Sequence, residues 1–284
     1  MTTQPYAEVI GDPIAHSKSP LIHNFWLAEL GLEGEYRRTH VRADDLPGYF
    51  AARRDDPAWR GCNVTVPHKQ AVLAHLDRVD PAAQAIGAVN VIVPENGGLC
   101  GYNSDGAGFL EPLTDLLGQT HLYRMARILG AGGAARAVTH ALVAEGFDPV
   151  VLTRTADKAR AFLDSLGIAG GHAAALESFA APTDFAFDDR VGLLDLVVNT
   201  TPLGMVGQPP LALDFSHVPP GSIVYDIVYA PLETPLLAEA RARGFRTIDG
   251  LAMLIGQAAA AFARFFGPAP PRDRDGELRA RLTA

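Results

Sequence analysis

Two side chains of opposite charge have types and settings suited to proton transfer. Lys69 ends the segment NVTVPHK, and Asp105 lies in the segment NSDG. A lysine ammonium stabilises negative charge that develops on an oxygen and can exchange a proton with it, while a carboxylate beside it orients the ammonium. Taken singly, each also has a structural interpretation: Lys69 as a solvated lysine at a helix start, and Asp105 as the N-cap of a helix that begins at Gly106.

A predicted hairpin brings a third polar side chain to Asp105. Strand-like segments at 88–93 and 99–103 flank the sequence PENG, whose Asn-Gly pair is a strong turn signal. With the turn centred near Glu95 and Asn96, Asn90 lies roughly opposite Asn103. Asn90 and Asp105 are therefore expected to meet at the open end of the hairpin.

Two hydroxyls and a lysine immediately precede a helix signal. In the segment HSKSP, Ser17 and Ser19 come before Pro20, which fits the first position of a helix that continues to Gly31. The structural interpretation makes Ser19 the N-cap, which satisfies a free backbone N–H. Helix N-termini with neighbouring hydroxyls also bind carboxylates and phosphates, so the functional interpretation is a small-anion site.

A glycine-rich turn separates a second strand signal from a second helix signal. The sequence GAGGAA follows a strand at 127–129 and precedes a helix that ends at Gly146, and another strand follows at 150–152. This order is typical of a dinucleotide-binding unit, in which the turn contacts a pyrophosphate at the helix N-terminus. The structural alternative is a tight turn that permits close helix packing. The residues expected at the pyrophosphate are Gly130, Ala131, Gly132, Gly133 and Ala134.

The residues after the second strand distinguish the two nicotinamide cofactors. An acid about twenty residues beyond the first glycine holds the ribose hydroxyls of NAD, whereas an arginine accommodates the 2′-phosphate of NADP. Here the chain has Thr153, Arg154 and Thr155, with Lys158 one helical turn further on, which favours NADP. Asp157 suits a helix N-terminus, but it would repel a phosphate if it pointed inward.

The elements that carry these residues alternate between strands and helices, which predicts an α/β protein. Further strands at 194–199 and 222–227 extend a parallel sheet, and a helix at 251–266 is followed by a polar, proline-rich tail. At 284 residues and 48% hydrophobic content, the chain is long enough for two domains.

Composition excludes several classes of partner. The net charge is −8 and no block of lysines or arginines interrupts it, so neither nucleic acid nor a membrane surface is an expected partner. Cys62 and Cys100 lack the spacing of a disulfide framework or a zinc site, and no metal is expected. The first residues lack a signal-peptide pattern and no apolar run reaches membrane-spanning length, which predicts a cytoplasmic location.

Nine segments, in this order, resemble the shikimate dehydrogenase family over nearly the whole chain. They are GDPIAHSKSP from Gly11, NVTVPHK from Asn63, IGAVN from Ile86, NSDG from Asn103, GAGGAAR from Gly130, TRT from Thr153, NTTPLGM from Asn199, YDIVYAP from Tyr225 and GLAMLIGQAAAAF from Gly250. The chain departs from the common pattern at Tyr102, Val91 and Ala252, where an acid, Thr and Gly are frequent. None of these three is an expected catalytic residue, but the departures bear on substrate preference.

The resemblance implies NADP-dependent, reversible reduction of 3-dehydroshikimate to shikimate, a step toward the aromatic amino acids. It also implies two α/β domains with the active site in the cleft. Residues 1–104 plus 250–284 would form the substrate-binding domain, and residues 105–249 a Rossmann-type, doubly wound domain that binds NADP.

The resemblance assigns roles at matching positions. Ser17 and Ser19 would hold the carboxylate of shikimate, with Lys18 pointing outward. Lys69 and Asp105 would be catalytic, although the resemblance does not fix which of them transfers the proton. The remaining implied substrate contacts are Thr65, Asn90, Tyr229 and Gln257, and the further implied cofactor contacts are Ile227 and Gly250.

Three alternatives stay open at this point. The nearest is a quinate or quinate/shikimate dehydrogenase, with NAD as an alternative cofactor, although Ser17, Ser19 and Arg154 favour shikimate and NADP. A non-catalytic dinucleotide-binding sensor would not need Lys69 and Asp105, and both are present. A two-domain folate dehydrogenase would share the architecture but not the segments HSKSP and NVTVPHK. The expected partner is a small-molecule substrate, and the expected state is a monomer or a homodimer.

Overall fold

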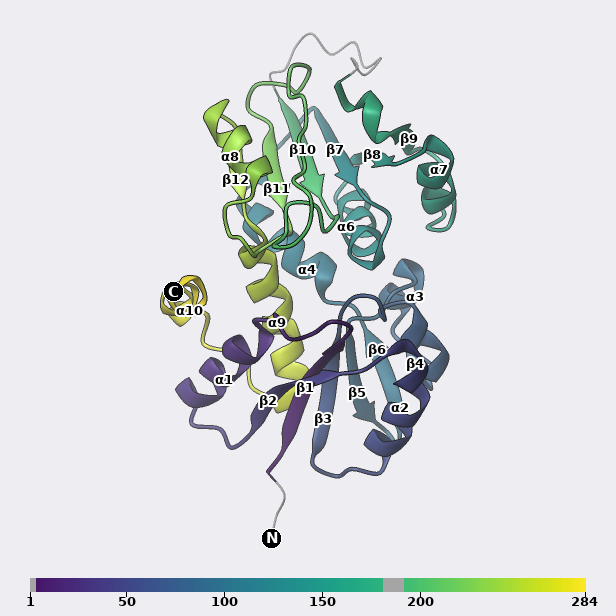
Figure 1. The fold of residues 1–284 in the computed structure, drawn as a ribbon, viewed down its shortest axis with the longest axis vertical. Helices are drawn as coiled ribbons and strands as arrows, with labels where there is room; N and C mark the ends of the chain where they lie inside the picture. Colours follow the sequence, from purple (N-terminus) through teal and green to yellow (C-terminus); the bar gives the residue numbers. More distant parts are fainter. Residues whose placement is uncertain (1–3, 181–191) are drawn as a thin grey trace. The chain divides into compact units, whose positions relative to one another are not determined.

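The computed structural model describes residues 4–180 and 192–284. The chain forms two compact units, one of Met1–Gly108 with Leu254–Ala284 and the other of Phe109–Met253 (Figure 1). The chain passes between the units inside two helices, α4 (Asp105–Leu110) and α9 (Gly250–Phe266). These crossings lie within about one helical turn of the expected domain boundaries.

The first unit contains a six-stranded mixed sheet of order β2-β1-β3-β5-β6-β4. β1 pairs in parallel with β2 and β3, β5 pairs antiparallel with β3 and β6, and β4 pairs in parallel with β6. The strands are β1 (Tyr6–Gly11), β2 (Glu35–His40), β3 (Trp59–Val64), β4 (Arg78–Val79), β5 (Val91–Glu95) and β6 (Gly98–Tyr102).

Helices cover both faces of this sheet because strand β1 places apolar residues on each side. Tyr6 and Ile10 of β1 share a core with Phe50 of α2, whereas Ala7 and Val9 share one with α9. The helices of this unit, besides α4 and α9, are α1 (Ser19–Glu29), η1 (Ala43–Asp45), α2 (Leu46–Arg54), η2 (Ala71–His75), α3 (Pro81–Ile86), η5 (Arg272–Arg274) and α10 (Asp275–Thr283).

The second unit contains a six-stranded sheet of order β12-β11-β10-β7-β8-β9, parallel throughout. Counted from β7 in chain order, this is the order 3-2-1-4-5-6 of a doubly wound Rossmann fold, with the switch point between β7 and β10. The predicted fold class is therefore confirmed. The strands are β7 (Tyr123–Leu129), β8 (Asp148–Thr153), β9 (His172–Ala175), β10 (Leu193–Asn199), β11 (Ile223–Asp226) and β12 (Arg246–Ile248).

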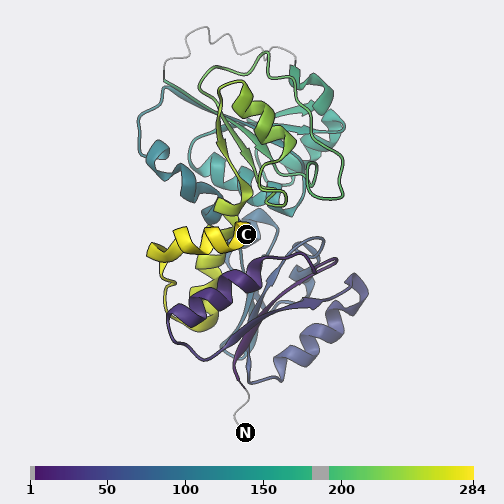
Figure 2. The same ribbon diagram turned by 60° about the vertical axis from the view of Figure 1, so that its left-hand side comes forward.

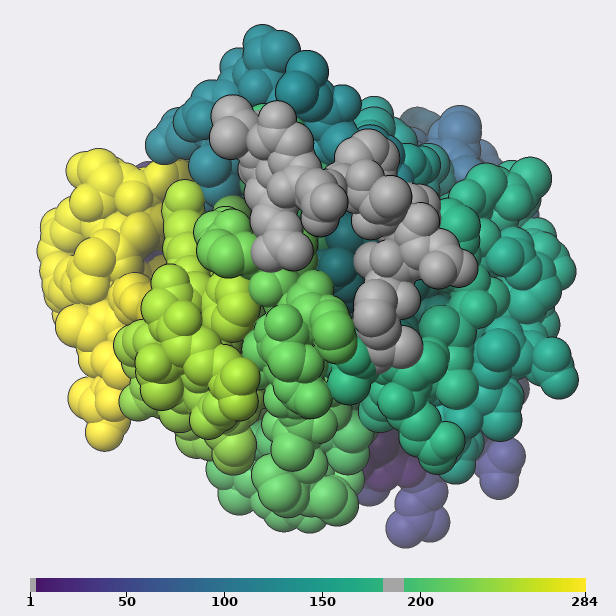
Figure 3. Space-filling model, turned by 90° about the horizontal axis from the view of Figure 1, so that it is seen from above, coloured from purple at the N-terminus to yellow at the C-terminus, as the bar shows by residue number. Residues whose placement is uncertain are grey.

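Helices again cover both faces of the second sheet. Val138 of α6 packs against Ile128 of β7 on one face, and Leu237 of α8 packs against Val224 of β11 on the other. α7 lies beside β9 and α8 beside β12, and these two strands form opposite edges of the sheet. Figure 3 shows the colours of the two helices, teal for α7 and yellow-green for α8, on opposite sides of this unit. The helices are η3 (Glu111–Leu113), α5 (Thr114–Leu117), α6 (Gly133–Ala144), α7 (Ala156–Asp164), η4 (Leu176–Ala180) and α8 (Pro235–Ala242).

The polar tail after α9 contains a helix that was not predicted from the sequence. α10 lies beside α1 (Figure 2), and it buries Leu278 and Leu282, which are four residues apart on one helical face. Two leucines are too weak a periodic signal, so the helix depends on packing against α1. Among the described residues, no helix has the length and apolar character needed to cross a membrane.

His23 of α1 is a fully buried imidazole. Its ring stacks on Tyr36 with a centroid separation of 3.9 Å, and neither ring nitrogen has a hydrogen-bond partner among the described residues. Burial lowers the pKa of His23 from 6.5 to about 3. Between these two pKa values the unfolded chain binds the extra proton, so the free energy of unfolding falls as the pH falls through this window.

We expect His23→Phe, which keeps a stacked ring, to remove this acid sensitivity. Between about pH 7 and about pH 5, the variant should lose about 2 kcal/mol less unfolding free energy than the parent. Urea unfolding at the two pH values measures the difference, and His16→Gln, at an exposed position, is the control. Equal losses in the parent and His23→Phe would show that His23 is not the group that titrates.

Candidate active site

Lys69 and Asp105 form an ion pair that is nearly buried. The Lys69 Nζ lies 2.5 Å from the Asp105 Oδ2, and the side chains are 13% and 5% exposed. Lys69 lies between β3 and η2, and Asp105 is the first residue of α4. Such limited exposure excludes most water from the pair, so each charge acts strongly on the other.

Asn90 holds the second oxygen of the same carboxylate. Its Nδ2 donates to the Asp105 Oδ1 at 2.8 Å, and its Oδ1 accepts from the backbone N–H of Ser104 at 2.7 Å. The predicted meeting of Asn90 and Asp105 is confirmed. The turn lies one residue further along than expected, at Asn96 and Gly97, because both have positive φ (50° and 77°), as the tightest hairpin turns require.

The backbone beside these side chains is held by strand β3. The Nδ2 of Asn63 donates to the Asn90 carbonyl at 3.0 Å, and the Tyr36 hydroxyl donates to the Asn63 Oδ1 at 2.6 Å. The backbone N–H of Val89 donates to the Lys69 carbonyl at 2.8 Å. Asn63 and Ser104 support the site although neither was predicted from its residue type alone; both lie in segments that carry the family resemblance.

Gln257 of α9 lies at the edge of this cluster. Its Oε1 is 3.4 Å from the Asn90 Nδ2, and its own Nε2 donates to the Leu254 carbonyl at 2.9 Å. Gly108 permits this approach, because a Cβ on it would lie 2.4 Å from the Gln257 backbone nitrogen. The absence of a side chain at Gly108 therefore lets α4 carry Asp105 close to α9.

Ser17 and Ser19 lie together at the start of α1, but not as expected. Their hydroxyl oxygens are 3.2 Å apart, and Arg38 donates to the Ser17 carbonyl at 2.8 Å. The prediction that Ser19 is the N-cap is wrong: Lys18 occupies the N-cap, and Ser19 begins the helix without a side-chain capping bond. Lys18 does not point outward as expected, because its Nζ donates to the Leu282 carbonyl of α10.

One edge of the first sheet collects these residues. Ser17 follows β1 and Thr65 follows β3, and the two strands are parallel, so their carboxyl ends share an edge. Asn90 precedes β5 and Asp105 follows β6, which run antiparallel to each other and bring both residues to that edge. Within the described chain, the Thr65 hydroxyl has no hydrogen-bond partner and is available to a ligand.

The glycine turn of the second unit leaves its backbone accessible. A Cβ on Gly130 (φ 114°) would lie 2.7 Å from the Thr200 hydroxyl oxygen, so only glycine fits there. A Cβ on Gly132 would meet nothing within 4 Å, so that part of the turn has open space in front of it. The N-terminus of α6 follows at Gly133, and this geometry fits a pyrophosphate.

Two cations after β8 lack partners. Arg154 and Lys158 are exposed, and neither side chain forms a hydrogen bond or ion pair within residues 4–180 and 192–284. Thr153 donates to the Thr155 carbonyl at 2.7 Å, and Thr155 caps α7. The turn is therefore fixed while both cations stay free to bind an anion. Asp157 is also exposed.

Ile227, Tyr229 and Gly250 lie at the carboxyl edge of the second sheet. Ile227 directly follows β11. A Cβ on Gly250 would lie 2.2 Å from the Ile227 carbonyl oxygen. The Gly250 N–H donates to the Val228 carbonyl at 3.2 Å. These contacts hold the backbone that leads to Tyr229.

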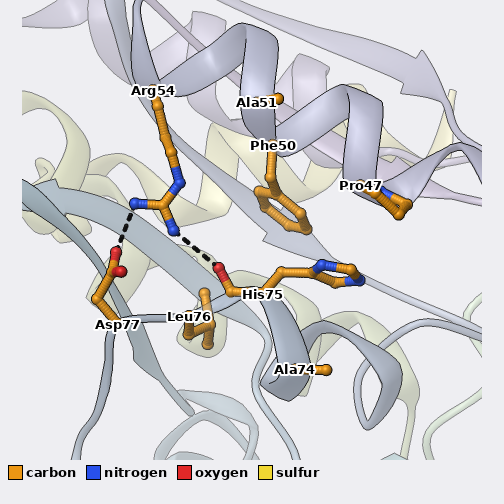
Figure 4. A pocket seen from close by; sticks show the side chains of 8 residues that line it. All are labelled: Pro47, Phe50, Ala51, Arg54, Ala74, His75, Leu76 and Asp77. Carbon is orange, nitrogen blue, oxygen red and sulfur yellow. Dashed lines mark hydrogen bonds and ion pairs between the residues drawn. The ribbon is translucent and has the colours of Figure 1, made fainter.

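A surface pocket between α2 and η2 is lined by none of these residues (Figure 4). Its charged groups satisfy one another, because Arg54 pairs with Asp77 at 2.5 Å and donates to the His75 carbonyl at 3.0 Å. Among the residues that the structure describes, no three His, Cys, Asp or Glu side chains gather to hold a metal ion.

Comparison with known proteins identifies the family. A model of the shikimate dehydrogenase substrate binding domain matches residues 9–92. The shikimate dehydrogenase (NADP(+)) of Sphingopyxis alaskensis is 52% identical over 99% of this chain and 97% of the relative.

Solved structures agree in fold. Shikimate 5-dehydrogenase of Thermus thermophilus, in complex with NADP(H) and shikimate, has a TM-score of 0.82 and 38% identity, and the match covers 98% of this chain and 99% of that one. The 5-ketofructose reductase of Gluconobacter sp. strain CHM43 has a TM-score of 0.83 at 27% identity, covering 99% and 100%. On the sequence identity over its full length, this chain belongs to the shikimate dehydrogenase family.

Proposed function

We propose that this protein catalyses the NADP-dependent, reversible reduction of 3-dehydroshikimate to shikimate. The observation that carries the proposal is the nearly buried Lys69–Asp105 pair, held by Asn90, in a chain of this family. The names of the similar proteins specify shikimate and NADP(+), which weighs against the quinate and NAD alternative. A cytoplasmic location and a monomeric or homodimeric state remain expectations from the sequence.

The residues at the edge of the first sheet would bind the substrate. Ser17 and Ser19 present two hydroxyls at the N-terminal end of α1, which suits the shikimate carboxylate because this end of a helix favours negative charge. The ring hydroxyls would be bound by Thr65, Asn90 and Asp105, and the proposed site also includes Tyr229 and Gln257.

Lys69 and Asp105 would manage the proton on the reacting oxygen. As the ketone is reduced, negative charge develops on its oxygen, and the Lys69 ammonium stabilises that charge and exchanges the proton. Asp105 holds the ammonium in place through its Oδ2, while Asn90 fixes the other carboxylate oxygen. The low exposure of the pair strengthens both effects.

The second unit would hold NADP, which supplies or accepts the hydride when bound. The backbone from Gly130 to Ala134 and the N-terminus of α6 would hold the pyrophosphate. Arg154 and Lys158 would hold the 2′-phosphate, with Thr153 and Thr155 shaping that turn. Ile227 and Gly250 would border the nicotinamide end.

An activity assay tests the proposal directly. Purified protein is mixed with shikimate or quinate and with NADP or NAD, and formation of the reduced cofactor is followed by absorbance. The highest kcat/KM is expected for shikimate with NADP. A higher value for quinate or for NAD would contradict the proposal, and binding of NADP without turnover of either acid would indicate a sensor.

We expect Lys69→Met to abolish most turnover while leaving binding intact. The interaction is made mainly in the transition state, so kcat should fall about 10²- to 10⁴-fold. Calorimetry should give dissociation constants for shikimate and NADP within about twofold of the parent. Lys18→Met, which also removes an ammonium, is the control and should keep kcat. A kcat for Lys69→Met within about threefold of the parent would refute the catalytic role.

Ser17→Ala should act on substrate binding instead. A hydrogen bond to a charged group contributes roughly 1.5–3 kcal/mol, so KM for shikimate should rise about ten- to a hundredfold. The methyl ester of shikimate lacks the carboxylate charge, and its KM should rise less. Steady-state kinetics with both compounds makes the comparison, and equal increases would contradict the carboxylate assignment.

Arg154→Ala should discriminate between the cofactors. Loss of a charge-assisted contact to the 2′-phosphate should raise KM for NADP about ten- to a hundredfold and leave KM for NAD nearly unchanged. Arg160→Ala, on the helix that follows Arg154, is the control, because its guanidinium donates to the Gly171 carbonyl. An equal increase for NAD would show that Arg154 does not read the 2′-phosphate.

A further inference from the structure

Asp226, the last residue of β11, is a buried carboxylate without a cation. It is fully buried, and no Lys, Arg or His of the described residues pairs with it. Burial raises the pKa of Asp226 above its ordinary value, although its hydrogen bonds oppose that shift. Burial of a carboxylate is unfavourable unless hydrogen bonds compensate the loss of water. The hydrogen-bond partners of Asp226 therefore indicate which parts of the chain it holds in place.

Three hydrogen bonds reach Asp226 from three different segments. Its Oδ1 accepts from the Asn199 Nδ2 at 2.9 Å and from the Val228 backbone N–H at 3.0 Å. Its Oδ2 accepts from the Thr234 hydroxyl at 2.7 Å. The Thr234 oxygen in turn accepts from the Leu237 N–H at the start of α8, so its own proton is free to point at Asp226.

Asn199 extends the network toward the glycine turn. Its Oδ1 accepts from the N–H and the hydroxyl of Thr201 at 3.0 and 2.7 Å. The next residue after Asn199, Thr200, donates its hydroxyl to the Leu129 carbonyl at 2.6 Å, and a Cβ on Gly130 would touch it. The segment after β10 is therefore fixed between Asp226 and the turn proposed to hold the pyrophosphate.

On the other side, the network fixes the backbone that leads to Tyr229. The N–H of Ile227 donates to the Asn199 carbonyl at 3.1 Å, and the N–H of Val228 donates to Asp226. The Val228 carbonyl accepts from Gly250 at 3.2 Å. Of the three groups that accept these backbone N–H bonds, Asp226 is the only side chain. An asparagine at this position would place an NH₂ group where one carboxylate oxygen now accepts a hydrogen bond.

The second buried aspartate of the same sheet behaves differently. Asp195 of β10 pairs with Arg127 at 2.5 and 2.6 Å and accepts from Ser222 at 2.6 Å. Asn199 is the residue of β10 that aligns with Asp226, and Asp195 comes earlier in β10, nearer the amino edge of the sheet. Asp195 thus joins neighbouring strands, whereas Asp226 holds segments at the carboxyl edge, where ligands of such sheets bind.

We propose that Asp226 is a positioning residue for the nicotinamide end of the cofactor, because its carboxylate fixes the backbone from Ile227 to Tyr229. The inference rests on the proposed function for the identity of the cofactor. It predicts that loss of the carboxylate affects the nicotinamide half of NADP and spares the adenosine half, which Arg154 and Lys158 are proposed to hold.

Calorimetry on the full chain tests this with NADP and with adenosine 2′,5′-bisphosphate, which lacks the nicotinamide half. Asp226→Asn should weaken NADP binding by about fivefold or more and leave the bisphosphate within about twofold of the parent. Asp195→Asn is the matched control. It should lower the melting temperature, as Asp226→Asn does, but leave both dissociation constants within about twofold.

Equal weakening of both ligands by Asp226→Asn, or no weakening, would overturn the proposal. If Asp226→Asn does not fold, Thr234→Val replaces it: this variant should show the same selective loss, and Thr234→Ser, which keeps the hydroxyl, should not. A selective loss in an enzyme that fails to oxidise shikimate would support the role of Asp226 and refute the proposed substrate. A parent that binds neither ligand would refute both.

Discussion

The ion pair between Lys69 and Asp105 is the constraint on which the first unit depends. Two charges with so little exposure are tolerable only when their remaining hydrogen-bonding capacity is satisfied. Asn90 meets that need at the Asp105 Oδ1, and Asn63 holds the Asn90 backbone in turn. The β5–β6 hairpin, the start of α4 and the close approach that Gly108 permits to α9 all serve to bring these groups to one edge of the sheet.

The second unit also buries a carboxylate among polar groups, but with different hydrogen-bond donors. Its parallel strands end at one edge, where the glycine turn and the cations after β8 are arranged for a phosphorylated ligand. A buried carboxylate again organises the polar groups, but at Asp226 the donors are an amide, a hydroxyl and a backbone N–H instead of a cation. Neutral donors fix the backbone without placing a fixed positive charge beside the proposed cofactor site.

Local signals predicted part of this architecture and failed where tertiary contacts decide. The Asn-Gly turn and strand alternation were sufficient to bring Asn90 to Asp105, and the glycine turn was sufficient for the Rossmann unit. The N-cap prediction at Ser19 was wrong because the helix begins at Ser19 itself, with Lys18 at the N-cap. The prediction that Lys18 points outward was wrong because Lys18 bonds to α10, a helix that packs on α1. The Lys69–Asp105 contact joins segments that are distant in the sequence, so it could not be predicted from either residue alone. It was predicted only from the family resemblance.

The proposed mechanism requires Lys69 and Asp105 to act on the reacting oxygen as one unit. A double-mutant cycle on kcat, with Lys69→Met, Asp105→Asn and the combined variant, tests it most directly. Groups that act together are strongly non-additive, so the combined variant should be no more than about threefold slower than the slower single variant. If the two losses multiply instead, the residues act independently, and the account of the ion pair as the catalytic unit is contradicted.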